Sequence, residues 1–193
     1  HKPTVISFEV VLRSGFLYFL VACEATVVDL VRGQLFAQYP TLEIEDVQDY
    51  ATNLSSSTVL SVLKLEHPDV YPLKTYKELE TDFLTNLSGL ATSVGTSELV
   101  GLQLVVSNID TASAAYKMQW LLTSQWYATL RKNSSIRELL AQKEAEKTQK
   151  PLFQTSLRIF ADAGEKSKQL TVSLGSLFKI LDNTNLNALK PKR

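Results

Sequence analysis

The sequence is poor in the residues that form covalent cross-links, metal centres and phosphate-binding loops. Its 193 residues include one cysteine, two histidines, one methionine and seven glycines. A single cysteine excludes an internal disulfide framework, and one cysteine with two separated histidines does not make a conventional zinc site. The glycines are scattered singly, and neither GxxxxGK[ST] nor GxGxxG occurs. We therefore predict no metal, no cofactor and no nucleotide hydrolysis for this chain.

Long hydrophobic runs and net charge are also absent. The richest apolar stretch, residues 16–23, is the size of a strand and far below the roughly 18 residues that span a bilayer. Twenty basic side chains balance 20 acidic ones, which argues against a protein that simply coats nucleic acid. Because 45% of the residues are hydrophobic, the chain can bury a core. Composition alone indicates an α+β protein.

The balanced total hides an uneven distribution of charge. Residues 1–110 carry 14 acidic and 6 basic side chains, and residues 111–193 carry 6 acidic and 14 basic ones. Blocks of charge are usually solvated faces. The functional alternative is self-association, in which an acidic face of one copy meets a basic face of the next. The sequence leaves both interpretations open.

Hydrophobic periodicity predicts the secondary structure. Alternating or continuous apolar runs predict strands at residues 4–13, 16–22, 41–47, 58–65, 99–106 and 152–161. Helical spacing predicts helices at residues 24–39, 76–94, 111–149 and 164–181, before a short extended tail. The run at 16–22 is apolar on both faces, which predicts a central place in a sheet.

The first and last strand–helix segments share a plan. FLYFLVA-CEAT-VVDLVRGQLFAQYP and TSLRIFA-DAGE-KSKQLTVSLGSLFKIL each contain a strand ending in alanine, a four-residue connection and a helix with a late phenylalanine. We predict an α+β fold of two ferredoxin-like (split βαβ) units with antiparallel sheets and helices on one face. The first unit, with an added strand and helix, occupies residues 1–110. A helical connector follows at 111–150, and a second βα unit at 151–193 completes the fold.

Nucleophile candidates are few. Cys23 lies at a predicted strand-to-helix junction, where a helix N-terminus would lower the pKa of its thiol. The histidines, His1 and His67, lie at the chain end and in a loop. Since free cysteine is among the most buried residue types, a structural Cys23 is the favoured interpretation.

An acidic cluster suggests a cation site only at first sight. Its members are Glu43, Glu45, Asp46 and Asp49. In a strand Glu43 and Glu45 share one face while Asp46 points to the other, so a solvated face is favoured. We assign no catalytic, cofactor-binding or metal-binding residue.

Aromatic and basic side chains gather in the helix predicted at 111–149. Trp120 and Trp126 precede Arg131 and Lys132, an arrangement that can stack the bases of a single strand. The favoured alternative is that the aromatics fill a seam between the two units, because such side chains dominate core energetics. These four residues are the candidate contacts to nucleic acid or a protein partner.

Three stretches, taken in order, resemble a known family. They are GQLFAQYPTLEIEDVQDY (33–50), YPLKTYKELETDFLTNLSGLATSV (71–94) and EKTQKPLFQTSLRIFA (146–161). Together they resemble the N-terminal, pre-motor region of bacterial type IV secretion, or conjugative transfer, ATPases of the HerA/FtsK-like superfamily. The resemblance extends over residues 5–189.

The resemblance implies a piece of a larger protein whose Walker motifs lie beyond Arg193, so no catalytic residue is carried over. It also implies a non-catalytic role in assembly or docking, with other secretion-system subunits or further copies of the chain as partners. The implied location is cytoplasmic, at the inner membrane through the parent protein.

Two alternatives come from other classes. The first is a free-standing ferredoxin-like small-molecule binder, for which the only titratable candidates at strand ends are Cys23, Asp162 and Glu165. The second is a single-stranded nucleic-acid-binding module.

Overall fold

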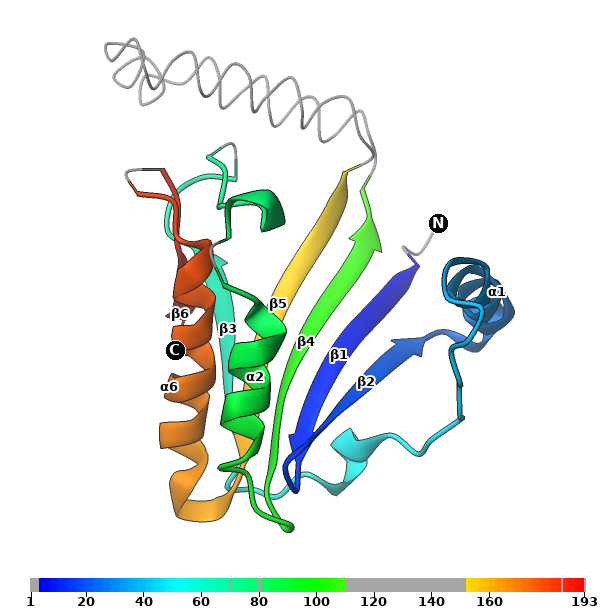
Figure 1. Cartoon of the computed structure of the whole chain (residues 1–193), viewed down its shortest axis with the longest axis horizontal. Coiled ribbons are helices and arrows are strands. Elements are labelled where there is room, and N and C mark those ends of the chain that lie inside the picture. The colour runs from blue at the N-terminus through cyan, green and yellow to red at the C-terminus, as the bar shows by residue number, and fades with distance from the viewer. Residues whose placement is uncertain (1–3, 70, 80, 110–151, 185, 193) are drawn as a thin grey trace, which may run out of the picture.

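One six-stranded sheet forms the centre of the molecule. The computed structural model describes residues 4–69, 71–79, 81–109, 152–184 and 186–192. The strands are β1 (Val5–Arg13), β2 (Phe16–Cys23), β3 (Val59–Leu65), β4 (Leu99–Asn108), β5 (Phe153–Asp162) and β6 (Leu189–Lys192). Every neighbouring pair is antiparallel, and the order β2-β1-β4-β5-β3-β6 makes β2 and β6 the two edges (Figure 1).

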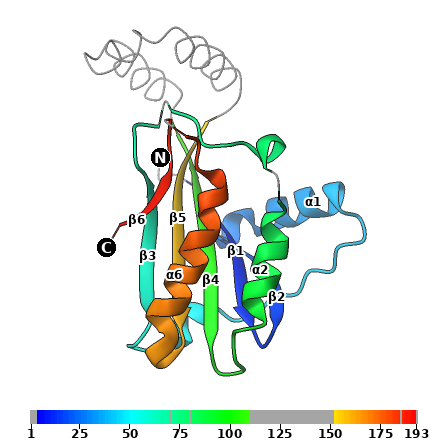
Figure 2. The same ribbon diagram turned by 60° about the vertical axis from the view of Figure 1, so that its left-hand side comes forward.

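Two helices cover one face of the sheet, and a third lies beyond its β2 edge. The covering pair is α2 (Phe83–Ala91) and α6 (Ser167–Leu177), whereas α1 (Val28–Gln38) follows β2 through the 3-10 turn η1 (Ala25–Val27) (Figures 1 and 2). The other 3-10 turns are η2 (Tyr50–Asn53), η3 (Tyr76–Glu78), η4 (Gly164–Lys166) and η5 (Phe178–Leu181).

The hydrophobic core lies between the sheet and the pair α2 and α6. Alternate strand residues and the apolar stripes of the two helices meet there. The main members are Leu12, Val100, Leu102, Ile159, Ala161, Leu87, Ala91, Leu170, Leu174 and Phe178. Because each fully buried aliphatic or aromatic side chain stabilises the fold by about 1.5–3 kcal/mol, this layer supplies most of the driving force.

The opposite side of the sheet, called here the second face, is crossed by the segment between α1 and β3. The Tyr50 ring stacks on Phe160 of β5, with ring centroids 5.5 Å apart. Gly101 of β4 permits this packing, because a Cβ atom there would lie 2.6 Å from the Phe160 ring. The crossing segment is therefore held on the sheet by aromatic contact.

Five of the six predicted strands are confirmed as β1 to β5, but one predicted strand is absent. Residues 41–47 are extended and belong to no strand. Their sequence alternates, yet α1 has carried the chain beyond β2, where no described strand pairs with them. Alternation alone does not supply a pairing partner.

The predicted central position of residues 16–22 is wrong. They form β2, which lies at the edge of the sheet. The tight turn at Ser14 and Gly15 directs β2 back along β1 as the outer arm of a hairpin, and no described strand follows on its other side.

The predicted helices are shorter than expected. The helix expected at 76–94 is a 3-10 turn followed by α2, which begins where the Asp82 carboxylate accepts a hydrogen bond from the Leu84 amide. The helix expected at 164–181 is α6 with a 3-10 turn at each end. The extended tail is β6.

The α+β class is confirmed, with one sheet in place of the separate sheets that we expected. Strands from the two predicted units pair directly, β4 with β5 and β3 with both β5 and β6. They join because Ile159 and Ala161 of β5 enter the same core as Val100 and Leu102 of β4. The helical connector predicted at 111–150 lies outside the described residues.

Candidate interaction surface

The structure does not bring the candidate nucleophile together with a base. Cys23 is half-buried at the end of β2, whereas His67 follows β3, and three strands lie between β2 and β3 in the sheet. His1 lies outside the described residues. Within the described ranges, no group of three or more histidine, cysteine, aspartate or glutamate side chains could hold a metal ion.

The acidic cluster is divided among separate structural contacts. Asp46 accepts a hydrogen bond from Arg32 of α1 at 2.7 Å, which ties the extended segment to that helix. Asp49 caps η2 by accepting from the Ala51 amide at 2.8 Å. Glu43 and Glu45 are exposed. The cluster is therefore a solvated surface with two local anchors.

The remaining predicted positions divide into two groups. Trp120, Trp126, Arg131 and Lys132 lie outside the described residues, so their contacts stay predictions. Asp162 accepts hydrogen bonds from the Ser55 amide, at 2.8 Å, and from its hydroxyl group. These bonds hold the pKa of the Asp162 carboxyl below its usual range, which marks an anchor for the crossing segment.

A buried polar cluster on the second face joins β1, β4 and the crossing segment. Glu9 is 7% exposed, and its carboxylate accepts from the Tyr50 hydroxyl, from Ser7 at 2.6 Å and from Gln103 at 3.3 Å. Gln103 also donates to the Tyr50 oxygen at 2.9 Å. Burial, followed by the bond to Glu9, raises the pKa of Tyr50 above its ordinary value.

This cluster acts as a structural anchor for the crossing segment. Among the described residues, the donors to the Glu9 carboxylate are neutral, and His67 does not belong to the cluster. It positions Tyr50 on Phe160 and so fixes the crossing segment. Local sequence patterns do not reveal it, because Tyr50 and Gln103 are distant from Glu9 in the chain.

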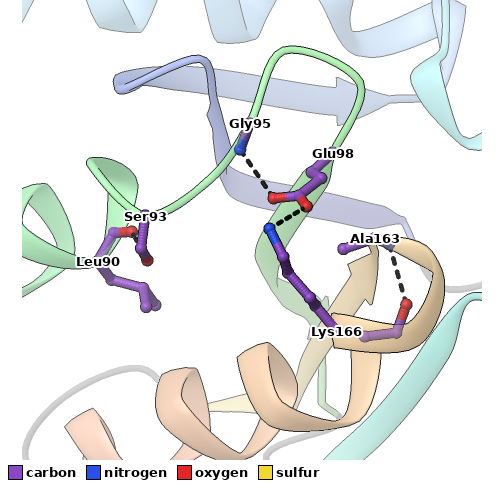
Figure 3. A network of polar contacts seen from close by, with 7 residues as sticks. Leu90, Ser93, Gly95, Glu98, Ala163 and Lys166 are labelled. Carbon is purple, nitrogen blue, oxygen red and sulfur yellow. Dashed lines mark hydrogen bonds and ion pairs between the residues drawn. The ribbon is translucent and has the colours of Figure 1, made fainter.

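A second anchor joins the start of β4 to the start of α6 (Figure 3). The Glu98 carboxylate accepts from the Gly95 amide and from the Lys166 ammonium group, both at 2.8 Å. The ammonium group, followed by the Gly95 bond, lowers the pKa of Glu98. This network fixes the loop between α2 and β4 against α6.

The loop before β6 contains a small depression of about 170 Å³. The Asn187 amide group beside it donates to the carbonyl oxygens of His67, Pro68 and Tyr71 at 2.9–3.3 Å. Ligand pockets usually measure roughly 300–1,000 Å³, so this one is too small for a typical small molecule. Asn187 serves to hold two loops together.

The two edges of the sheet differ in chemistry. β6 has four residues, including Lys190, Pro191 and Lys192, and such short, charged, proline-containing strands resist pairing with another chain. β2 has eight residues with no charge, proline or glycine, and Phe16 and Phe19 are 66% and 65% exposed. Within the described chain, no backbone hydrogen bond joins the outer edge of β2 to another segment.

Apolar exposure continues from β2 into α1, which has no buried residue. We call this region the β2–α1 surface. Its large exposed apolar side chains are Phe16, Tyr18, Phe19, Val21, Leu30 and Phe36. Phe16 and Tyr18 pair with Arg13 and Val11 and lie on the second face, whereas Phe19 pairs with Val10 and lies on the face that the helices cover. Exposed apolar side chains on both sides of an unpaired edge strand are typical of an interaction site.

The second face is basic at the opposite end of the sheet. Lys64 lies opposite Lys190 and Val62 opposite Lys192, and Arg158 of β5 pairs with Val62. Because Leu63 points into the core, these even-numbered neighbours in β3 point to the second face. Lys190 also contacts Glu66 at 3.5 Å. Three adjacent strands thus present four basic side chains.

Comparison with known proteins gives no relative. No family model, curated protein or solved structure matches the chain. Among the described residues, no helix has the length and apolar character to cross a membrane. The function is therefore inferred from the chemistry of the surfaces and from residues 33–50, 71–94 and 146–161.

Proposed function

We propose that the chain is a non-catalytic assembly or docking domain of a type IV secretion, or conjugative transfer, ATPase and acts through protein–protein contacts. The observation that carries this proposal is the β2–α1 surface, which combines an uncharged edge strand with exposed aromatic side chains. The titratable groups with shifted pKa values, Tyr50, Glu98 and Asp162, each anchor a loop. The family itself is proposed from the resemblance of residues 33–50, 71–94 and 146–161.

The proposal extends to the architecture. We propose that β3–α2–β4 and β5–α6–β6 form one ferredoxin-like unit to which β1, β2 and α1 are added. Two features of the strand order support it. β5 lies between β3 and β4, and β3 lies between β5 and β6, as in interleaved split βαβ motifs. The added hairpin then becomes the part that carries the docking surface.

Two experiments test the proposed function. The first reads the open reading frame on both sides of the chain, where a Walker A loop downstream of Arg193 supports the proposal and an immediate stop codon contradicts it. The second deletes residues 1–193 from the parent protein. We expect ATP hydrolysis by the isolated motor to persist while recruitment to the membrane complex is lost. Normal recruitment of the deletion protein would contradict a docking role.

The basic end of the second face favours one further candidate function, binding of a single-stranded nucleic acid. Lys64, Arg158 and Lys192 lie close enough in register to follow a phosphate backbone. The test is fluorescence anisotropy with a labelled oligonucleotide over a range of salt. We expect Lys64→Glu with Arg158→Glu to weaken binding at least tenfold, and Lys74→Glu with Lys77→Glu to serve as the matched control. Equal binding by both double variants would remove this candidate.

A further inference from the structure

The hairpin turn determines which backbone groups of β2 face outward. Ser14 and Gly15 have φ values of 52° and 82°, as in a two-residue turn of type I′. In such a turn Arg13 and Phe16 form the first hydrogen-bonded pair, and hydrogen-bonded pairs then alternate along the ladder. Phe16, Tyr18, Leu20 and Ala22 therefore direct their amides to β1. The amides and carbonyls of Leu17, Phe19, Val21 and Cys23 face outward.

We infer that the outer edge of β2 pairs with β2 of a second copy of this chain, antiparallel and about a two-fold axis at Leu20. The inference deepens the proposed function, on which it rests, by naming the partner and the strand. Only this register joins all four outward residues with one another. Leu17 then lies opposite Cys23 of the second copy, and Phe19 opposite Val21 of the second copy.

The chemistry of β2 favours its own copy as partner. Like charges placed directly opposite each other destabilise a strand pair, and β2 has no charged residue, so pairing with itself meets no such repulsion. A charged partner strand would have to lose hydration beside Phe19 and Val21. The β6 edge shows the contrast, because self-pairing there would bring lysines together and lack the donor of Pro191.

Charge at the end of the strand favours the antiparallel direction. Glu24 directly follows β2 with an extended backbone. The two-fold register places Glu24 of each copy opposite Phe16 of the other, so the two carboxylates lie at opposite ends of the paired strands. A parallel, in-register pair would instead place the two Glu24 carboxylates side by side, and like charges placed opposite each other are destabilising.

A proline substitution tests the pairing without breaking the monomer. Val21→Pro removes an outward amide, a position at which edge strands tolerate proline, whereas the control Val21→Thr keeps that amide. We expect sedimentation equilibrium to show reversible dimers of the unchanged chain and of Val21→Thr. We expect the dimer dissociation constant of Val21→Pro to rise at least about tenfold, with its thermal unfolding still cooperative. A dissociation constant for Val21→Pro equal to that of the unchanged chain would overturn the inference.

Cross-linking tests the register independently. In a hydrogen-bonded pair the Cα atoms lie about 5.5 Å apart, within disulfide range. Leu17→Cys should therefore form a disulfide-linked dimer with the native Cys23 of the second copy under mild oxidation. Tyr18→Cys, which faces Ala22 of the second copy, should not. Equal cross-linking of both variants would overturn the register.

A strictly monomeric chain at millimolar concentration would overturn the second-copy inference. It would leave the proposed function standing, because a different subunit can pair with the same edge. Normal recruitment of the deletion protein, by contrast, would remove the proposed function, whereas the dimer measurement would still show whether two copies pair through β2. The two failures are therefore distinguishable.

Discussion

The helices α1 and α6 have the same length and the same place after a strand and a 3-10 turn, but only α6 has buried residues. Each has 11 residues, follows a strand through a 3-10 turn, and carries the pattern Gly-x-Leu-Phe at its end, Gly33 to Phe36 in one and Gly175 to Phe178 in the other. α6 buries Ser167, Leu170, Thr171 and Leu174, whereas α1 buries no residue. Phe178 is 5% exposed and Phe36 is 41% exposed.

The difference comes from the strand that precedes each helix. β5 has β4 on one side and β3 on the other, so the helix that follows it can pack on a broad sheet. β2 is an edge strand, and α1 continues beyond it (Figure 2). A strand–helix pattern therefore specifies local structure, while the place of the strand in the sheet decides how much of the helix is buried.

The largest expected difference is between substitutions of the two phenylalanines, Phe178 and Phe36. Phe178→Ala should lower the free energy of unfolding by about 3–5 kcal/mol, because it leaves a cavity beside Phe83 in the core. Phe36→Ala should cost less, about 1 kcal/mol, since Phe36 is already 41% exposed. Urea unfolding followed by circular dichroism measures both. Equal losses would show that α1 is packed as firmly as α6.

The next effect concerns the buried polar cluster around Glu9, which holds the crossing segment on the sheet. Tyr50→Phe removes a donor from the buried Glu9 carboxylate and should cost about 1–3 kcal/mol of unfolding free energy. Tyr39→Phe, at an exposed position in the same segment, is the matched control and should change it by less than about 0.5 kcal/mol. A neutral Tyr50→Phe would mean that the hydrogen bond to Glu9 is dispensable and that the aromatic stacking and the other anchors hold the segment.

Alanine substitutions of the two matching glycines, Gly33 and Gly175, should have smaller effects. Unlike the changes above, Gly33→Ala should stabilise the fold. Gly33→Ala should stabilise the protein by about 0.5–1 kcal/mol, because alanine favours helix and nothing lies within 4 Å of the added Cβ. At Gly175 the added Cβ would lie 3.2 Å from Ile159 Cδ1, and Ile159 is fully packed. Gly175→Ala should therefore be neutral or destabilising. Thermal unfolding distinguishes the pair, and equal stabilisation would contradict the difference in packing.

The smallest expected difference is between the two ion pairs Glu98–Lys166 and Asp46–Arg32, and it depends on pH. The folded pKa of Glu98 lies below its ordinary value of 4.5, so its stabilisation is present above that pH and is lost as the pH falls through the folded value. Glu98→Gln should remove up to about 1 kcal/mol at neutral pH and flatten the loss of stability in acid.

Asp46→Asn, which breaks the exposed pair with Arg32 of α1, is the control for the ion pairs. It should change the free energy of unfolding by less than Glu98→Gln does at neutral pH. If the free energy of unfolding of Glu98→Gln fell as steeply in acid as that of the unchanged chain, another carboxyl group would be responsible for the loss of stability.

Sequence patterns predicted the positions of the strands along the chain better than the place of each strand in the sheet. The strands at 58–65 and 99–106 were predictable because Leu63, Val100 and Leu102 alternate with residues of the other face. The edge position of β2 was not predictable, because an uncharged apolar strand satisfies the pattern of a central strand as well. The same ambiguity hid the candidate docking edge.

The long-range contacts of the Glu9 cluster could not be predicted from the sequence, for a different reason. Glu9, Tyr50 and Gln103 are brought together by strand register and by a segment that crosses the second face. Each residue alone fits a solvated strand or loop. Nothing in the local sequence distinguishes a carboxylate that will be buried from one that stays exposed.

Residue-resolved amide hydrogen exchange of the unchanged chain, at low and high protein concentration, tests the central claim most directly. We predict that the amides of Tyr18 and Leu20 are protected at both concentrations, because they face β1. The amides of Phe19 and Val21 should exchange fast at low concentration and become protected at high concentration. If the chain associates while the amides of Phe19 and Val21 remain unprotected, the contact lies elsewhere and the account of the β2 edge is contradicted.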